Sequence, residues 1–452
     1  MTQLTRELGI FVAQLKYDQI PQAALDVIHM GFADCVGVML AGRDEPPTKI
    51  LTEVLNPAAG PANLMFTHKT AQAPEAAWIN GVAAHALDFD DVAIKGHPST
   101  VLVPAIIAEA QTLGSSGRDM MVAYAAGYEV WADLARREPE HYHSKGWHPT
   151  GILGAIGAAA ACASLHQLSA EQCATAIAIG ASQSAGIMAN FGTMTKPFHA
   201  GHSAQSGVLA ARLAKAGFTA ALDALEHTQG FLAAVSPSGK IDTVVPVDSG
   251  QVWRLTQSKL SVKKYPLCFC THRALDGMLD LVAEHKIIAE QIQSITASTS
   301  ERNTQVLRNH TPQTGLEAKF SMEFAMVSCV VAGRAGLSEL TDDFVQNPVV
   351  QELMQRVSVI ADSKEDPKLP GYAPFDLVTV TLKDGKKIES RQVTAVRGGP
   401  DIPLSREQLW AKFQDCARVG GAEHIAQRLF DALMSLETVT HVNQIPGLDA
   451  PR

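Results

Sequence analysis

Apolar residues recur at helical spacing along most of the first 250 residues. In the segment 21–41, Leu25, Ile28 and Phe32 begin a series of apolar residues three or four positions apart, and Gly42 ends it. The residues 62–68 have the composition of a short strand or an extended segment. The periodicity predicts further helices over 4–16, 74–87, 100–113, 117–136, from Gly151 onward, from Ser169 to about 185, and over 202–216.

The pattern changes after about residue 250. Residues 294–300 and 356–361 have strand-like composition, and Asp384-Gly385 separates two alternating runs, 377–383 and 386–393, as in a β-hairpin. Helical spacing returns over 272–285, 319–335, 342–355 and 404–436. We therefore expect a mainly α protein. A large all-α helical domain of residues 1–265 is completed by C-terminal helices within 400–452, and a smaller α+β domain of residues 266–399 is inserted between them.

Composition narrows the classes of function. Hydrophobic residues make up 46% and charged residues 18% of the 452 residues, which suits a large packed core. The net charge is −9 and no Lys/Arg run is present, so we expect no nucleic-acid partner. The N-terminal residues do not resemble a signal peptide, and the most apolar run, 151–165, is too short to cross a bilayer. We therefore expect no membrane association, and the seven scattered cysteines, which are typical of reduced thiols, lead us to expect a cytoplasmic location.

One stretch, residues 85–100, holds an unusual density of ionisable side chains between two apolar segments. It contains Asp88, Asp90, Asp91 and His97, and His85 at its start is interpreted as a core histidine. One hypothesis is a general acid–base site, in which carboxylates orient a histidine. A second is a Mg²⁺ site for a diphosphate, although the usual paired aspartate motif is absent. The third is a solvated, charged loop.

Two further segments place histidine or lysine beside a predicted helix start. His148 and Thr150 immediately precede the small-residue helix, where free N–H groups attract a carboxylate. Lys196 and His199 precede the helix predicted over 202–216, where they suit an anionic substrate. The alternatives are an ordinary capped helix start and a surface loop.

A fourth segment combines two lysines with cysteine and histidine. Lys263, Lys264 and His272 are interpreted as carboxylate ligands, and Cys268 and Cys270 as packing residues, because their spacing does not match a zinc site. No Walker loop, G-x-S-x-G elbow or dinucleotide fingerprint is present. We therefore expect no cofactor and no metal, and chemistry carried out by side chains alone.

Taken in order, these segments resemble the MmgE/PrpD family, which includes 2-methylcitrate dehydratase, cis-aconitate decarboxylase and iminodisuccinate epimerase. The resemblance implies a large all-α domain with an α+β lid domain, a homodimer, and catalysis without a cofactor. It places Asp88, His97, His148, Lys196 and Lys263 in the catalytic pocket, and we assign substrate binding to Asp91, Thr150, His199, Lys264 and His272. The matching stretches run from Asn80-Gly81 through His85–Asp91, His97–Ser99, Gly146–Gly151, Lys196–Gly201 and Lys263–Pro266 to Phe320–Ala325.

The position after Asp91 departs from the family pattern. Family dehydratases and decarboxylases usually have threonine there, whereas this chain has Val92. Our leading hypothesis is a hydro-lyase, a dehydratase that acts on a 2-methylcitrate-like small di- or tricarboxylate by removing an α-proton. The alternatives are an epimerase or isomerase, a cis-aconitate-type decarboxylase, and a non-catalytic polycarboxylate-binding protein.

Overall fold

The computed structural model describes residues 3–367 and 371–449. The polypeptide forms two compact units, residues 1–262 with 405–452, and residues 263–404. The domain boundaries predicted from the sequence, at 265/266 and 399/400, lie near these limits. That the two parts fold as separate domains stays a prediction.

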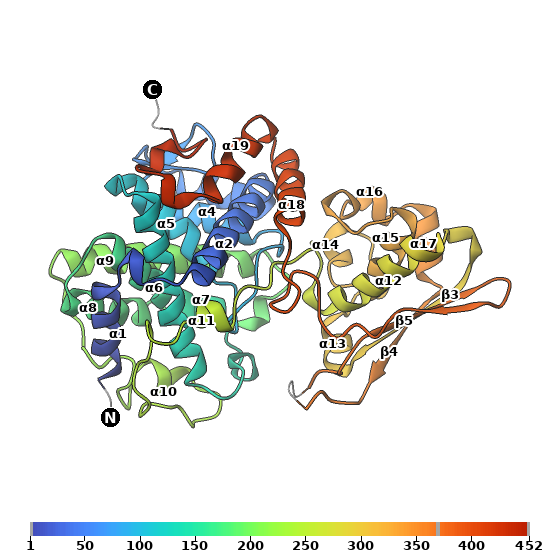
Figure 1. Ribbon diagram of the computed structural model, residues 1–452, viewed down its shortest axis with the longest axis horizontal. Helices are drawn as coiled ribbons and strands as arrows, with labels where there is room; N and C mark the ends of the chain where they lie inside the picture. Colours follow the sequence, from blue (N-terminus) through green and yellow to red (C-terminus); the bar gives the residue numbers. More distant parts are fainter. Residues whose placement is uncertain (1–2, 368–370, 450–452) are drawn as a thin grey trace. The chain divides into compact units, whose positions relative to one another are not determined.

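The first unit is helical apart from one small antiparallel ribbon (Figure 1). In that ribbon β1 (Ala62–Asn63) pairs with β2 (Thr70–Ala71), within and just after the segment expected to be extended. The helices of this unit are α1 (Leu4–Gln14), α2 (Gln22–Gly42), α3 (Pro46–Leu55), α4 (Ala73–His85), α5 (Ser99–Leu113), α6 (Gly117–Arg136), α7 (Pro149–Leu165), α8 (Ala170–Ser182), α9 (Thr195–Lys215), α10 (Phe231–Val235), α11 (Arg254–Gln257), α18 (Arg406–Val419) and α19 (Glu423–Leu433).

Small residues allow the central helices α4, α7 and α9 to approach closely. A side chain at Gly201 of α9 would lie 2.3 Å from the carbonyl oxygen of Trp78 in α4, and one at Gly207 would lie 2.3 Å from the Cβ of Ala158 in α7. Nearly every residue of α7 is buried. This close packing holds the ends of α4, α7 and α9 together, and those ends carry the candidate site residues.

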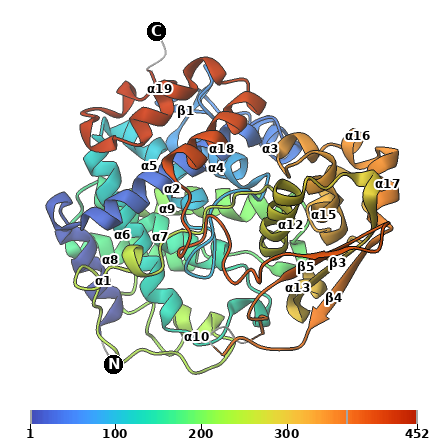
Figure 2. The ribbon, with the colours of Figure 1, turned by 45° about the vertical axis from the view of Figure 1, so that its right-hand side comes forward.

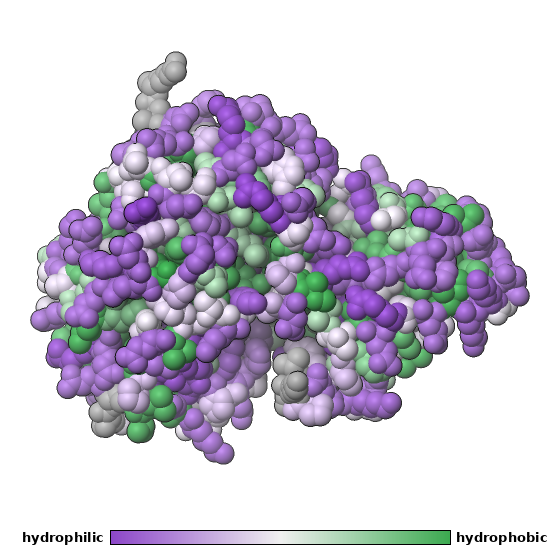
Figure 3. All heavy atoms as spheres, viewed as in Figure 1, coloured by the Kyte–Doolittle hydropathy of each residue, from purple (hydrophilic) through white to green (hydrophobic). Residues whose placement is uncertain are grey.

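Helix α2 is the one helix among the described residues that is long and apolar enough to cross a membrane. However, 83% of its most apolar stretch is buried inside the protein, so α2 is a helix of the hydrophobic core. It packs against α4 and α18, and the three lie side by side in both ribbon views (Figure 2). On the face of this unit seen in Figure 3, apolar residues are scattered among polar ones.

The second unit is a four-stranded sheet with helices (Figure 1). The strand order is β4-β3-β5-β6, with β3 parallel to β4 and antiparallel to β5. The predicted hairpin is present, and Gly385 takes the positive φ of 86° that its turn requires. The strands are β3 (Ile292–Ser300), β4 (Val357–Asp362), β5 (Leu377–Leu382) and β6 (Lys387–Glu389), and the helices are α12 (His272–His285), α13 (Glu301–Val306), α14 (Gly315–Ala318), α15 (Met322–Val331), α16 (Asp342–Val345) and α17 (Pro348–Met354).

The prediction of a mainly α protein with a small sheet region is confirmed, but several predicted elements were wrong in detail, among them the helix over 404–436, which is divided into α18 and α19. The helix predicted over 319–335 is shorter, because α15 begins after its cap residue Ser321 and ends at Val331, and the helix over 342–355 is interrupted before Pro348. Helix α9 begins at Thr195 instead of residue 202. Pro197 is compatible with that start, because the first N–H groups of a helix have no partner within it.

Candidate active site

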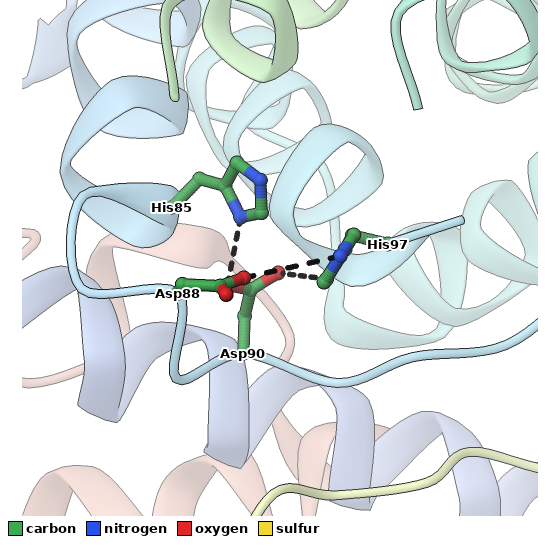
Figure 4. A group of neighbouring side chains, drawn as sticks. All are labelled: His85, Asp88, Asp90 and His97. Atoms are coloured by element: carbon green, nitrogen blue, oxygen red, sulfur yellow. Dashed lines mark hydrogen bonds and ion pairs between the residues drawn. The ribbon is translucent and has the colours of Figure 1, made fainter. Parts of the chain in front are cut away.

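The loop between α4 and α5 gathers the carboxylates and imidazoles on which the site is built. Helix α4 ends at His85 and α5 begins at Ser99. Figure 4 shows His85, Asp88, Asp90 and His97 directed toward one another. The alternative of a solvated loop is therefore wrong, since His85 and Asp90 have no exposed side-chain surface and His97 has 14%.

Asp90 is the centre of this group. One carboxylate oxygen lies 2.8 Å from Nδ1 of His85, and the other lies 2.9 Å from Nδ1 of His97. Burial alone would raise the pKa of Asp90, but its contacts with His85 and His97 hold that pKa well below the usual range. Asp90 is therefore an anion that is hydrogen-bonded to the His85 imidazole and in ion-pair contact with that of His97.

The two nitrogens of the His97 ring have different neighbours. Nδ1 of His97 also lies 2.9 Å from the carbonyl oxygen of Asp91, which keeps its proton on that side of the ring. The Nε2 atom lies 4.0 Å from a carboxylate oxygen of Asp88. The backbone N–H of His97 donates to the Thr150 hydroxyl over 3.2 Å. The ring is thus fixed on one edge and can exchange a proton at the other.

Lys196 and Asp88 form an ion pair beside His97. The Nζ atom of Lys196 lies 2.6 Å from the same oxygen of Asp88 that faces His97, and 5.6 Å from the ring centroid of Phe191. We predicted Lys196 and His199 in a segment preceding a helix, whereas both lie in the first turns of α9. Their spacing of three residues on the helix places both side chains on one side of it.

His148 and His199 form a second imidazole pair. Their Nδ1 atoms are 3.1 Å apart, so one ring donates a hydrogen bond to the other. Burial, with Lys196 and the neighbouring imidazoles, lowers the pKa of His148 well below its usual value, and burial lowers the pKa of His199 to about 4. The Phe191 ring packs edge-on against His148 with centroids 4.8 Å apart. Both imidazoles are therefore neutral at pH 7.

Sequence reasoning missed the part played by His85. We interpreted it as a core histidine, and it is buried, with burial lowering its pKa to about 4. Its ring, however, lies 4.6 Å from that of His97 and 6.1 Å from that of His148 between centroids, so it sits between the two candidate catalytic imidazoles. Its Nε2 has no hydrogen-bond partner among the described residues. The five-residue spacing to Asp90 carries no recognised signal, and only the turn at Asp88 brings the two together.

Asp91 and Thr150 take supporting positions. The Asp91 side chain is buried, and one of its oxygens lies 3.4 Å from the backbone nitrogen of Ser99. Burial, followed by the nearby Asp34, raises the pKa of Asp91 well above its usual value. Thr150, also buried, holds the backbone of His97. Their predicted contact with substrate stays a prediction that this geometry does not favour.

The remaining predicted residues belong to the second unit. Lys263 is its first residue and is buried, and the Nζ of Lys264 lies 5.3 Å from the centroid of the Tyr265 ring. Nε2 of buried His272 lies 3.2 Å from the carbonyl oxygen of Leu267 and the ring packs against Tyr265 and Phe269. Their roles in catalysis and substrate binding stay predictions.

The same loop offers donors for a metal ion. One ligand atom from each of His85, Asp88, Asp90 and His97 lies within 4.8 Å of the others. A cation there would have to displace the Lys196 ammonium from Asp88 and two imidazole N–H groups from Asp90. The donor set therefore suits a hydrogen-bonded proton-transfer site better than a resident metal.

The class of protein follows from comparing this helical fold and its cluster of histidine, aspartate and lysine side chains with known families. The MmgE/PrpD N-terminal domain matches residues 6–243, and the MmgE/PrpD C-terminal domain matches residues 265–437, so the chain belongs to the MmgE/PrpD family. The resemblance found in the sequence is thereby confirmed. The C-terminal family domain extends beyond the second unit into α18 and α19.

The chain is also similar to individual proteins of known name. The chain is similar to human "Cis-aconitate decarboxylase", with 31% identity over 75% of this chain and 71% of the relative. It is 29% identical to the Mus musculus protein of the same name, over 75% of this chain and 70% of the relative. It is also 23% identical to "Cis-aconitate decarboxylase-like protein oryM" of Aspergillus oryzae, over 98% of this chain and 97% of the relative.

Proposed function

We propose that this protein is a lyase that uses neither metal nor organic cofactor and removes carbon dioxide from a small unsaturated tricarboxylate of the cis-aconitate type. The observation that carries the proposal is the His97–Asp90 pair beside the Lys196–Asp88 ion pair, in a chain whose relatives are named cis-aconitate decarboxylases. Decarboxylation, one of the alternatives considered from the sequence, thus replaces dehydration of a 2-methylcitrate-like acid as the leading hypothesis.

The reaction needs a proton donor and a way to hold negative charge. When the carboxylate on the saturated arm leaves as carbon dioxide, the electron pair of the broken C–C bond forms a new double bond. The electron pair of the original double bond then takes a proton at the carbon that bears a remaining carboxylate. Positive charge fixed near that carboxylate stabilises the developing enolate-like anion.

His97 is suited to deliver the proton. Its Nδ1 atom lies 2.9 Å from a carboxylate oxygen of Asp90 and its Nε2 atom 4.0 Å from one of Asp88, so the ring has a carboxylate at each nitrogen. Nδ1 is held by Asp90 and the Asp91 carbonyl, which leaves Nε2 to donate toward substrate. We assign His97 as the general acid, and general acid–base catalysis typically contributes ~10²–10⁴-fold.

His148 and Lys196 would complete the pocket. The pKa of His148 is lowered well below its usual value by burial and by Lys196, so it is present as a neutral imidazole that can accept or donate a hydrogen bond. Lys196 supplies an ammonium group beside Asp88. We propose that Lys196 releases part of its contact with Asp88 to neutralise a substrate carboxylate.

Dehydration is the second candidate, and the neutral state of His148 favours it. A neutral imidazole can remove an α-proton, while His97 protonates the departing hydroxyl group. An epimerase would use the same two groups on opposite faces of one carbon. Val92, in place of the threonine usual in family dehydratases and decarboxylases, lies in the same loop and bears on this choice.

A screen of small acids tests these candidates. The protein is incubated with cis-aconitate, 2-methylcitrate, citrate and iminodisuccinate, and products are identified by mass. Loss of carbon dioxide from cis-aconitate supports the proposal, whereas loss of water supports dehydration, and α-deuterium exchange without loss of mass supports epimerisation. A thermal shift with an acid but no turnover would indicate a non-catalytic binding protein.

A matched pair of histidine variants assigns the activity to this site. His97→Gln should abolish most of the turnover. His310→Gln alters a histidine whose side chain is 65% exposed in the second unit, and it should retain turnover. Equal activity in both variants would reject His97 as the proton donor.

The oligomeric state and the cellular location of the protein are two further proposals. We propose a homodimer in the cytoplasm, on the basis of the family resemblance and of seven cysteines without a disulfide among the described residues. Light scattering on the purified protein measures the mass of the assembly.

A further inference from the structure

The loop that carries the candidate site holds an unfavourable backbone conformation. Asp88 has a φ of +51°, and Ile94 and Lys95 have φ values of +41° and +67°. Residues with a Cβ atom rarely adopt such angles, because Cβ approaches the following carbonyl group. Tertiary contacts therefore have to hold the loop in place, and the turn at Asp88 is where its two functional carboxylates are set.

Lys412 of α18 supplies one of these contacts from 323 positions away in the sequence. Its Nζ donates to the carbonyl oxygen of Phe89 over 2.7 Å and lies 3.9 Å from the centroid of the Phe89 ring. It also forms an ion pair of 2.5 Å with Asp34 of α2. The Lys412 side chain is 6% exposed and that of Asp34 is 0% exposed.

The carbonyl group that accepts this hydrogen bond lies between the two carboxylates of the candidate site. Phe89 stands between Asp88, which pairs with Lys196, and Asp90, which pairs with His85 and His97. The carbonyl of Phe89 belongs to the peptide group that leads into Asp90. A hydrogen bond to this oxygen therefore fixes how the Asp90 side chain is presented to His97.

We infer that Lys412 is a positioning residue for the reaction: its ammonium group, held by Asp34, clamps the Phe89 peptide and keeps Asp90 in contact with His97. This inference rests on the proposed function, because it assigns Lys412 a role in the same proton-transfer site. Lys412 does not touch the reacting atoms and acts through the backbone between the two carboxylates.

Replacing Lys412 alone would remove two interactions at once, so their effects could not be separated. Lys412→Met takes the donor from Phe89 but also leaves Asp34 buried without its ion-pair partner, which is strongly destabilising. The double variant Lys412→Met/Asp34→Asn removes both charges and still leaves Phe89 without its donor. The double variant therefore separates the clamp from the cost of an unpaired charge.

The experiment compares wild type, Lys412→Met, the double variant and Lys412→Arg on the acid that the wild type turns over. We expect Lys412→Met to lower both the Tm and kcat, and the double variant to recover much of the Tm while kcat stays roughly 10- to 100-fold low with little change in KM. Lys412→Arg keeps a charged donor and should recover part of kcat.

A neighbouring ion pair provides the control. Arg418 lies on the same helix, with its side chain 48% exposed and bonded to Asp415. Arg418→Met should change neither kcat nor the Tm appreciably. Recovery of both Tm and kcat in the double variant would overturn the inference, as would wild-type kcat in Lys412→Met.

A structural measurement keeps this test independent of the proposed function. If the wild type turns over none of the acids, the proposed function fails, and the inference is then tested by a crystal structure of the double variant. We expect the turn at Asp88 to relax and the 2.9 Å contact between Asp90 and His97 to be lost. An unchanged loop would show that Lys412 does not position it.

Discussion

Asp90 and Asp91 are adjacent and fully buried, yet we expect Asp90 to be ionised and Asp91 to be neutral. Contacts with His85 and His97 hold the pKa of Asp90 well below its usual range, despite the opposing effect of burial. Burial, with Asp34 and Asp90 nearby, raises the pKa of Asp91 well above its usual range. Replacing each carboxyl group by an amide of similar shape therefore perturbs the two positions differently.

The size of the Asp90→Asn effect follows from the bonds that Asp90 makes. One of its oxygens lies 2.9 Å from Nδ1 of His97, within hydrogen-bonding distance. A hydrogen bond to a charged group contributes ~1.5–3 kcal/mol. If this bond stabilises the protonated state of His97 used in the reaction, its loss lowers kcat roughly 10- to 150-fold. Asp91→Asn replaces a group that is already neutral, so kcat should remain within about twofold of the wild type.

Thermal unfolding across pH provides a second measurement. The folded-state pKa of Asp90 is depressed, so its contribution to stability is present above the unfolded value of about 4 and is lost as pH falls below it. The folded-state pKa of Asp91 is raised, so it favours the folded state at low pH, and this advantage is lost as pH rises above about 4. Asp91→Asn should therefore raise the Tm at neutral pH, whereas Asp90→Asn should lower it.

The comparison of the two variants can refute the reasoning. Equal losses of kcat in Asp90→Asn and Asp91→Asn would contradict the assignment of one charged and one neutral carboxyl group. A lower Tm in Asp91→Asn than in the wild type at neutral pH would contradict it too. Either result would mean that burial and ion pairing do not set these protonation states.

Three further predictions concern charge and metal. Lys196→Met should raise KM and lower kcat by tenfold or more in steady-state kinetics, because it removes the ammonium 2.6 Å from Asp88, and Lys196→Arg should retain more activity. Dialysis against EDTA should leave turnover unchanged, while added Zn²⁺ should inhibit by occupying the His85, Asp88, Asp90 and His97 donors. Burial raises the pKa of Glu129 to about 7, so the Tm of the wild type should fall as pH rises from about 4.5 through 7. The Tm of Glu129→Gln should fall less over the same pH range.

Local sequence signals were sufficient for most of the fold. Ser169 and Gln172 form the predicted capping box, and Asp384-Gly385 forms the predicted hairpin turn, because both depend on contacts within a few residues. The start of α9 was wrong because we interpreted Lys196 and His199 as preceding the helix. A proline in the first turn is compatible with a helix start, and the run of small residues after it continues the helix.

The density of charged residues indicated candidate segments of the site, and the family resemblance selected the catalytic residues within them. Asp88, His97, His148 and Lys196 came from motifs, and the structure brings them together in the first unit. The partners that fix them did not come from the sequence. His85 meets Asp90 through a turn with positive φ, and Lys412 meets Phe89 across 323 positions, and neither contact leaves a local signal.

The net charge of the candidate site affects how it could bind the proposed tricarboxylate. The Lys196–Asp88 ion pair adds no net charge, so the Asp90 anion leaves the cluster negative beside the neutral imidazoles of His85, His148 and His199. A tricarboxylate would be repelled by such a group unless positive charge were added. Binding a tricarboxylate would therefore require uptake of a proton by the site. Binding should therefore be tighter at lower pH within the stable range.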